Sequence, residues 1–247
     1  MLIKGGSDNY DTPIGIICLD SKFPKPSGHI RNPTTFKFPT IQYVVKGVDV
    51  KRLLFERTPE LIEPFIQAAK DLEQSGVEAI SGSCGFLALY QKEIAASVNI
   101  PVLLSSLLQV PLLQMMYSPN VRIGILTASK QALTSEHLQA VGVVHQDNLF
   151  IKGMEGKEHF WTCIVEGKQH DFDMKIMEQE IRSSAGELKK QYDIDVLVLE
   201  CTDLSAFSAS IQEEIQVPIF DINTLVELTQ SALWRITYNR HRFLQLE

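Results

Sequence analysis

Two of the four cysteines lie where a thiol could exchange protons with a bound molecule. Cys84 and Cys201 each follow an apolar run that reads as a strand and precede a stretch with helical spacing. In an open α/β protein this junction is the carboxyl edge of a parallel sheet, where ligands bind. It is also a helix N-terminus, which favours anions and is expected to lower the pKa of a thiol. Inverting a carbon centre by proton transfer needs a base on one face and an acid on the other, and two thiols could fill both roles.

An internal repeat puts these two cysteines in equivalent positions. Residues 77–84 align without a gap with residues 194–201, at an offset of 117 residues. The alignment continues to a proline that follows each cysteine by 17 residues. A fainter match joins residues 14–17 to residues 123–126 at an offset of 109. The repeat predicts a duplication and two related lobes, whose cysteines point at a ligand from opposite sides.

The other two cysteines have a different setting. Cys18 lies within an apolar strand and Cys163 within the apolar segment 160–165, so we expect both to be buried structural thiols. The cysteine spacing fits neither a zinc site nor a disulfide framework, and the six histidines form no spaced pair on one helix face. We therefore expect no metal site, and free thiols in a reducing cytoplasm.

The elements that must position the two cysteines alternate between strand and helix along the chain. The expected strands are 13–20, 40–46, 77–83, one from 102, 122–127, 196–200 and 217–221. The expected helices are 58–76, one ending near 98, one ending near 117, 130–141, 171–192, 206–214 and 222–238. This alternation predicts an α/β architecture with mostly parallel sheets.

Charge and composition narrow the function classes. The chain has 247 residues with 23 Lys+Arg against 30 Asp+Glu, a formal net charge of −7. This balance excludes a general nucleic-acid binder and argues against adhesion to anionic membranes. Residues 94–121 carry no formal charge, but prolines and polar residues interrupt them, which favours helix, strand and helix over a membrane span. The first residues lack the apolar run of a signal peptide.

The segments around the cysteines resemble those of a known group of enzymes. With Ser83-Cys84-Gly-Phe-Leu-Ala88, Glu200-Cys201-Thr202-Asp203-Leu204 and the two lobe-opening strands, the sequence resembles the aspartate/glutamate racemase superfamily, which includes hydantoin racemases. The resemblance covers essentially the whole chain. It implies two pseudo-symmetric Rossmann-like lobes, each with a mostly parallel sheet flanked by helices, and a site in the cleft between them.

The resemblance also implies a mechanism and an organisation. Cys84 and Cys201 match the two catalytic cysteines of a two-base reaction that needs no cofactor, and Thr202 matches a threonine that helps to hold the substrate carboxylate. A homodimer is implied as well. Residues 1–118 with 222–247 are expected to form the N-terminal lobe, completed by the C-terminal helix, and residues 119–221 the second lobe.

Further substrate contacts are expected around the same edge. The backbone N–H groups of Gly85 and Phe86 would face the carboxylate. Other candidates end the two lobe-opening strands or lie in the loop after the first one, where Arg31 could grip a second carboxylate bidentately. They are Asp20, Ser21, His29, Arg31, Asn32, Thr127 and Ser129.

Two departures from the superfamily pattern leave the substrate open. Gly85-Phe86 stands where amino-acid racemases typically have Asn-Thr, and Asp203 stands where they have His or often Glu. The leading prediction is a cofactor-independent racemase or isomerase of a small carboxylate of amino-acid, aspartate/glutamate or hydantoin type. The alternatives are a maleate isomerase or arylmalonate decarboxylase, a non-catalytic two-lobe protein that binds a small carboxylate, and a redox switch that pairs Cys84 with Cys201.

Overall fold

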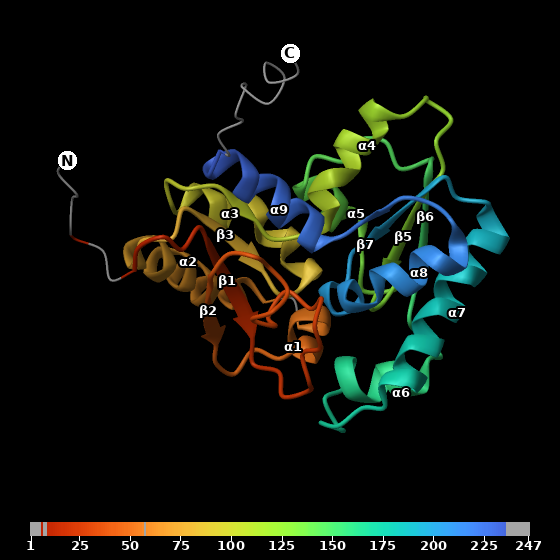
Figure 1. Cartoon of the computed structure of the whole chain (residues 1–247), viewed down its shortest axis with the longest axis horizontal. Coiled ribbons are helices and arrows are strands. Elements are labelled where there is room, and N and C mark those ends of the chain that lie inside the picture. The colour runs from red at the N-terminus through yellow and green to blue at the C-terminus, as the bar shows by residue number, and fades with distance from the viewer. Residues whose placement is uncertain (1–5, 7–8, 57, 236–247) are drawn as a thin grey trace, which may run out of the picture.

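Two four-stranded parallel sheets form the centre of the molecule (Figure 1). The computed structural model describes residues 6, 9–56 and 58–235. The first sheet has the order β2-β1-β3-β4 and the second β6-β5-β7-β8. Their strands are β1 (Ile14–Leu19), β2 (Thr40–Val45), β3 (Ala79–Gly82), β4 (Val102–Leu103), β5 (Ile123–Thr127), β6 (Leu149–Gly153), β7 (Val196–Leu199) and β8 (Ile219–Phe220).

Helices connect the strands and cover both sheets. The α-helices are α1 (Val50–Phe55), α2 (Glu63–Ser75), α3 (Gln91–Ala96), α4 (Val110–Met116), α5 (Ser135–Ala140), α6 (Glu158–Phe160), α7 (Met174–Tyr192), α8 (Ser208–Ile215) and α9 (Ile222–Leu233). The 3₁₀ helices are η1 (Pro59–Ile62), η2 (Gly85–Tyr90), η3 (Ser106–Gln109) and η5 (Thr202–Phe207), and η4 (Trp161–Val165) is a π-helix. Within the described ranges, no helix has the length and apolar character that crossing a bilayer requires.

The sequence repeat extends to the register of the two sheets. Ile14 of β1 pairs with Thr40 of β2 and Ala79 of β3. Ile123 of β5 pairs with Leu149 of β6 and Val196 of β7, which lie at the offsets of 109 and 117 found in the sequence. The fold is therefore α/β with two related lobes, as the sequence predicts.

A glycine in each lobe-opening strand admits the helix that packs against it. β1 and β5 are buried along their whole length, as parallel strands covered on both faces must be. A Cβ at Gly15 would lie 3.0 Å from Leu72 of α2, and one at Gly124 would lie 3.1 Å from Leu188 of α7. Both glycines thus serve close packing between a strand and a long helix.

The last described helix returns to the first sheet (Figure 1). Ile222 and Val226 of α9 belong to one buried cluster with Ile14 and Ile16 of β1 and Leu103 of β4. The division into residues 1–118 with 222–247 and residues 119–221 stays a prediction. Residues 236–247, and with them the expected end of the last helix at 238, lie outside the described residues.

Several elements differ from the sequence expectation. β6, α1, α6 and the π-helix were not predicted, and β6 is only partly buried because it is an edge strand with one neighbour. The helix expected from residue 130 begins at Ser135, because Thr134 has extended backbone angles and forms a capping box with His137. The strand before Cys84 is shorter than predicted at both ends, and the strand before Cys201 ends one residue early.

Candidate functional site

Both cysteines lie at the same point of their lobes, two residues beyond a central strand. Cys84 follows β3 and caps η2, and Cys201 follows β7 and caps η5. The residues are 8% and 6% exposed. In each loop a backbone N–H two residues further on, from Phe86 or Asp203, donates to the sulfur. Each thiol thus accepts an equivalent backbone hydrogen bond in its own lobe.

The two cysteine loops interlock across the lobe interface. Thr202 Oγ1 donates to the carbonyl oxygen of Ser83 at 2.6 Å. In the opposite sense Gly85 lies so close to Glu200 that a Cβ there would overlap the carbonyl and carboxyl oxygens of Glu200. The repeat relates Ser83 to Glu200 and Gly85 to Thr202. In both contacts, therefore, the residue after one lobe's cysteine touches the residue before the other lobe's cysteine. The interface therefore brings the loops of both thiols together.

The expected lowering of the thiol pKa values is wrong for this structure. Burial raises the pKa of Cys84 well above its ordinary value, and the Glu200 carboxyl raises it further. Burial likewise raises the pKa of Cys201, with added contributions from Asp203, Glu200 and Cys84. The backbone N–H groups act in the opposite direction but are outweighed. Low-dielectric surroundings and neighbouring acids dominate because burial leaves a thiolate at either site poorly solvated.

A hydrogen-bonded chain joins Cys201 to the first lobe. The Cys201 thiol donates to Asp203 Oδ2 at 3.5 Å, and His29 Nε2 lies 2.9 Å from Asp203 Oδ1. The N–H of Arg31 donates to His29 Nδ1, so the ring proton is on Nε2 and is donated to Asp203. His29 is 2% exposed. Asp203 thus links the Cys201 thiol to an imidazole 174 residues away in the sequence.

The charges in this chain follow from burial and its hydrogen bonds. Burial lowers the pKa of His29, although Asp203 acts against this, so the imidazole is neutral near pH 7. Burial alone would raise the pKa of Asp203, but the hydrogen bond from His29 and the nearby Lys25 outweigh it and lower the pKa. Asp203 is therefore a carboxylate that accepts hydrogen bonds from both neighbours.

Lys25 adds a partly buried cation beside this chain. Its Nζ donates to the carbonyl oxygen of Phe23 at 2.8 Å and lies 3.0 Å from the centroid of the Phe23 ring. Burial lowers the pKa of Lys25 to about 7, while Asp203 acts to raise it. An aromatic ring near Asp203 therefore already faces a cationic group in this structure.

Arg31, Ser21 and Asn32 are engaged within the loop that follows β1. Arg31 Nη1 donates to the carbonyl oxygen of Leu19 and to Ser21 Oγ, each at 3.1 Å. Asn32 Nδ2 donates to the carbonyl oxygen of Lys25 at 2.6 Å. These bonds shape the loop that carries His29, and they hold the guanidinium of Arg31 against the end of β1.

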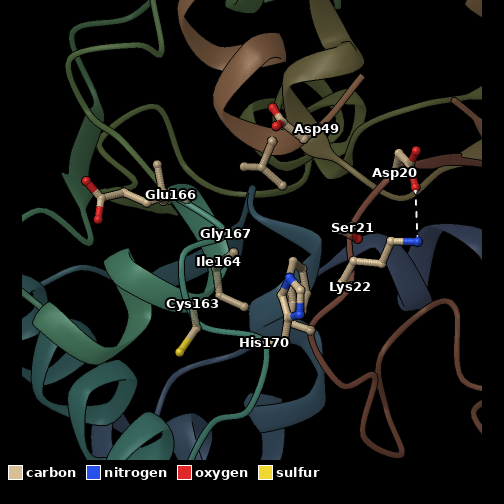
Figure 2. A pocket seen from close by; sticks show the side chains of 12 residues that line it. Asp20, Ser21, Lys22, Asp49, Cys163, Ile164, Glu166, Gly167 and His170 are labelled. Atoms are coloured by element: carbon tan, nitrogen blue, oxygen red, sulfur yellow. Dashed lines mark ion pairs between the residues drawn. The ribbon is translucent and has the colours of Figure 1, made fainter. Parts of the chain in front are cut away.

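Asp20 lies in a separate pocket at the outer edge of the lobe interface (Figure 2). Its carboxylate pairs with Lys22 at 3.8 Å, and the same pocket receives Ile164 and His170 from the second lobe. The lining residues are Asp20, Ser21, Lys22, Phe23, Asp49, Val50, Cys163, Ile164, Val165, Glu166, Gly167 and His170. Neither Cys84 nor Cys201 lines it, so the structure does not bring Asp20 to the paired thiols.

A smaller cavity adjoins Asp203. It shares Phe23 and Ile164 with the outer pocket, and Asp203 and His29 lie in its wall. Most of its lining is aromatic or aliphatic. The residues are Phe23, Pro24, Pro26, His29, Phe160, Ile164, Phe172, Met177, Asp203 and Phe207. A carboxylate beside several phenyl rings is a setting that suits a weakly hydrated cation.

The remaining expected contacts, Thr127, Ser129 and Phe86, have partners within the protein. Thr127 Oγ1 donates to Glu200 Oε2 at 2.6 Å. Ser129 Oγ donates to Glu155 Oε1 at 2.9 Å. The Phe86 ring packs edge-on against His137, with centroids 5.3 Å apart, so its side chain belongs to the core and only its backbone faces Cys84.

Sequence reasoning did not assign roles to Asp203 and Glu200, or pair His29 with either. Asp203 and Glu200 flank Cys201 within two residues, which is a signal that the sequence contains. The partner of each lies more than 70 residues away, and only the folded chain shows it.

Solved structures resemble the chain over almost its full length. Allantoin racemase from Klebsiella pneumoniae matches with a TM-score of 0.60 at 9% identity, covering 96% of this chain and 100% of that one. Picrophilus torridus aspartate racemase matches with a TM-score of 0.58 at 16% identity, covering 91% and 96%. The chain has the fold of the aspartate/glutamate/hydantoin racemase superfamily. This fold also occurs in unliganded arylmalonate decarboxylase, with a TM-score of 0.55 at 14% identity over 93% of this chain and 96% of that one.

The curated relatives found by sequence are named as lyases and not as racemases. Dimethylsulfoniopropionate lyase 3 of Emiliania huxleyi is 27% identical over 219 residues, which is 84% of this chain and 56% of that protein. The dimethylsulfoniopropionate lyase of Durusdinium sp. clade D is 25% identical over 214 residues, 84% of this chain and 70% of that protein. This racemase-fold chain thus spans only about half the length of the first of these relatives. No model of a known protein family matches it.

Proposed function

We propose that the protein is a cofactor-independent enzyme that removes the proton from the carbon next to the carboxylate of a small substrate. The observation that carries the proposal is the interlocked pair of cysteine loops, in which Cys201 is held by Asp203 and Asp203 by His29. Cys201 is the proposed base, because its thiol has a side-chain partner that orients it. Thr202 and the backbone N–H groups of Gly85 and Phe86 stay the proposed carboxylate contacts. In this structure the Thr202 hydroxyl donates to Ser83 and the Phe86 N–H to Cys84, so both would exchange these acceptors for the substrate.

The raised thiol pKa values indicate which substrates could be activated. A positive charge within a few ångströms favours the thiolate, whereas the carboxylates around Cys201 disfavour it. A substrate with a cationic group close to the reacting carbon would supply that charge. Both an amino acid and a sulfonium-bearing propionate meet this condition.

Elimination is the outcome that the sequence relatives favour. In 3-(dimethylsulfonio)propionate, Cys201 would take a proton from C2, the C2–H electron pair would form the C2–C3 double bond, and the C3–S bond would break. Dimethyl sulfide would leave with the sulfur electron pair, acrylate would remain, and the proton would pass from Cys201 to solvent. The cavity lined by the phenyl rings beside Asp203 has a volume of about 10 Å³ in this structure, and Lys25 covers the face of Phe23. The sulfonium group would bind to these rings only after Lys25 moved away and the cavity widened.

Racemisation is the second candidate, favoured by the equivalent position of Cys84 in the other lobe. There Cys84 would return a proton to the opposite face of the same carbon. The reaction needs no leaving group on the neighbouring carbon. The substrate would then be an amino acid, a hydantoin or a related small carboxylate.

Proton NMR in D₂O separates these outcomes. The purified chain is incubated with 3-(dimethylsulfonio)propionate, aspartate, glutamate, allantoin, maleate and phenylmalonate in separate samples. Acrylate and dimethyl sulfide indicate elimination, and deuterium at the α-carbon without acrylate indicates racemisation. Isomerised maleate or decarboxylated phenylmalonate would replace both proposals, and a raised melting temperature without any reaction would indicate a binding protein.

Single substitutions test the catalytic role of each thiol. We expect Cys201→Ser to reduce either reaction by ~10²–10⁴-fold, the usual contribution of a general base. Cys84→Ser should abolish racemisation but leave part of an elimination, which needs only one base. Cys163→Ser is the matched control, since that thiol is buried in η4 and lies outside both cysteine loops. Full activity in Cys201→Ser would contradict the assignment.

Two expectations about the whole protein stay predictions. They are a homodimer and a cytoplasmic location. The four free thiols are compatible with the second expectation. Sedimentation analysis of the purified chain tests the first, and fractionation of the source cells tests the second.

A further inference from the structure

Glu200 has one carboxyl oxygen without a hydrogen-bond partner. The residue is 0% exposed and connects β7 to Cys201. Its Oε2 accepts a hydrogen bond from Thr127 Oγ1 at 2.6 Å, but its Oε1 has no partner. An unpaired polar atom in a protein interior costs free energy, so the unpaired Oε1 of Glu200 calls for a functional reason.

The free oxygen lies at the interface between the two thiols. A Cβ at Gly85 would overlap Glu200 Oε1, so this oxygen touches the backbone beside Cys84 in the other lobe. The Glu200 charge acts on the pKa of Cys84 and of Cys201. In the proposed elimination Cys201 reaches the reacting substrate carbon, and in racemisation both thiols do. The substrate carboxylate is one bond from that carbon. The carboxylate must therefore lie against the same interface.

The surroundings of Glu200 favour its neutral form. The titratable groups that face it are Cys84 on the first lobe and Cys201 and Asp203 on its own lobe, all of which are neutral or acidic. No ion pair within the described residues includes Glu200. Burial raises the pKa of Glu200 to about 8, although the bond from Thr127 acts to lower it.

We propose that Glu200 is a neutral carboxylic acid in the resting protein and that its Oε1–H donates a hydrogen bond to the carboxylate of the bound substrate. Thr127 occupies Oε2 as a donor, so the proton belongs on Oε1. This inference rests on the proposed function in so far as the ligand is a small carboxylate. As the α-proton leaves, negative charge spreads into that carboxylate, and a donor placed there stabilises the transition state more than the ground state.

The role requires a glycine at position 85 and an acid at position 200. Any side chain at 85 would displace the Glu200 carboxyl from the interface. An ionised Glu200 would repel the substrate carboxylate instead of binding it. Glu200 is thus a candidate substrate-binding residue whose protonation state decides whether binding occurs.

Infrared difference spectroscopy tests the protonation directly. The wild-type spectrum minus that of Glu200→Gln should contain the C=O band of a protonated carboxyl at pH 6, and this band should disappear on titration through about pH 8. Saturating 3-(dimethylsulfonio)propionate or propionate should move the band to lower frequency. Glu187→Gln is the control, because two lysine hydrogen bonds lower the pKa of Glu187 to about 2 and no such band is expected. A missing band at pH 6, or one that neither ligand moves, overturns the inference.

Kinetics give a second readout. Glu200→Gln keeps a donor, so its kcat/KM at pH 7 should stay within ~10-fold of wild type and should lose the decline above pH 8. Glu200→Leu removes the donor and should lower kcat/KM by ~10²-fold, in the range for a lost transition-state hydrogen bond. If the infrared band is present and moves but no acid is turned over, the proposed function fails and the inference stands. If turnover occurs without the band, the inference fails alone.

Discussion

The hydroxyl of Thr202 donates a 2.6 Å hydrogen bond to the carbonyl oxygen of Ser83, a residue 119 positions earlier in the chain. The bond connects the residue after one cysteine to the residue before the other. Thr202 is 0% exposed, so water cannot replace this bond in the closed interface. The separation of the two thiols is therefore set by the docking of the lobes and not by either cysteine loop alone.

Thr202→Val should loosen this docking. The substitution leaves the Ser83 carbonyl oxygen without its side-chain donor, at an expected cost of ~1–3 kcal/mol in the free energy of unfolding. Urea denaturation measures the loss, and Thr202→Ser should recover most of it. Ser106→Ala is the matched control, because it removes a bond of the same length to Leu199 without changing a residue next to either cysteine. Equal catalytic losses in the Val and Ala variants would contradict a special role of Thr202 at the thiols.

Gly85→Ala should separate the cysteine loops. The added Cβ would overlap the backbone carbonyl of Glu200 as well as its carboxyl, so shortening residue 200 cannot relieve the contact. We expect a loss of at least ~1–3 kcal/mol, as for other overpacked sites, in urea denaturation. Gly186→Ala in α7 is the control: its nearest neighbour would be 3.6 Å away, and Ala is favoured in a helix by ~0.5–1 kcal/mol. A Gly85→Ala protein as stable as wild type would disprove the tight contact.

The resting thiols should react slowly with alkylating agents. Burial and neighbouring acids raise the pKa of both Cys84 and Cys201, so little thiolate is present at pH 7.5. We expect labelling by iodoacetamide at least ~10-fold slower than that of a free thiol, whose pKa is about 8.5. Mass spectrometry of the labelled peptides measures each site, and unfolding in urea should make all four cysteines equally reactive. Rapid labelling of Cys201 in the folded protein would contradict the raised pKa and support the lowered pKa that the sequence predicts.

Asp203→Asn should change the titration of both its neighbours. Removing the negative charge should lower the pKa of Cys201, and one pKa unit would increase its alkylation rate at pH 7.5 by ~10-fold. The pKa of His29 should fall further, because the bond to Asp203 acts to raise it. NMR titration of His29 and labelling of Cys201 check the two shifts. An unchanged His29 titration would show that the 2.9 Å contact is not formed in solution.

Glu200 should make the stability of the protein fall as the pH rises. Its folded pKa of about 8 lies above the unfolded value of about 4.3, so the folded state binds more protons between these two values. The resulting stabilisation is fully present below pH 4.3 and is lost as the pH passes through 8. Urea denaturation at pH 5, 6, 7 and 8 should show this decline in wild type and a smaller one in Glu200→Gln.

Glu187→Gln is the control for this pH dependence. Lysine hydrogen bonds lower the folded pKa of Glu187 to about 2, so its contribution is lost only as the pH falls below its unfolded value. The slope between pH 5 and 8 should therefore equal that of wild type. Equal slopes in all three proteins would mean that Glu200 is ionised in the folded chain.

The order of elements and the paired cysteines could be read from the sequence because their signals are local or repeated. The apolar runs of β1 and β5 and the helical spacing of α2 and α7 each depend on short stretches of chain. The offsets of 109 and 117 residues reappear in the strand register, so the repeat predicted equivalent places for Cys84 and Cys201. The edge strand β6, which is only partly buried, was missed.

The side chains that surround the thiols are brought together only by the packing of the two lobes against each other. The bond between His29 and Asp203 joins residues 174 positions apart, and the contact between Gly85 and Glu200 joins opposite lobes, so no local pattern contains either. The thiol pKa values changed direction for the same reason. The sequence indicates a helix N-terminus, whose dipole favours the thiolate. Burial and the carboxyl groups of Glu200 and Asp203 outweigh that dipole. Both depend on tertiary packing, which no local stretch of sequence contains.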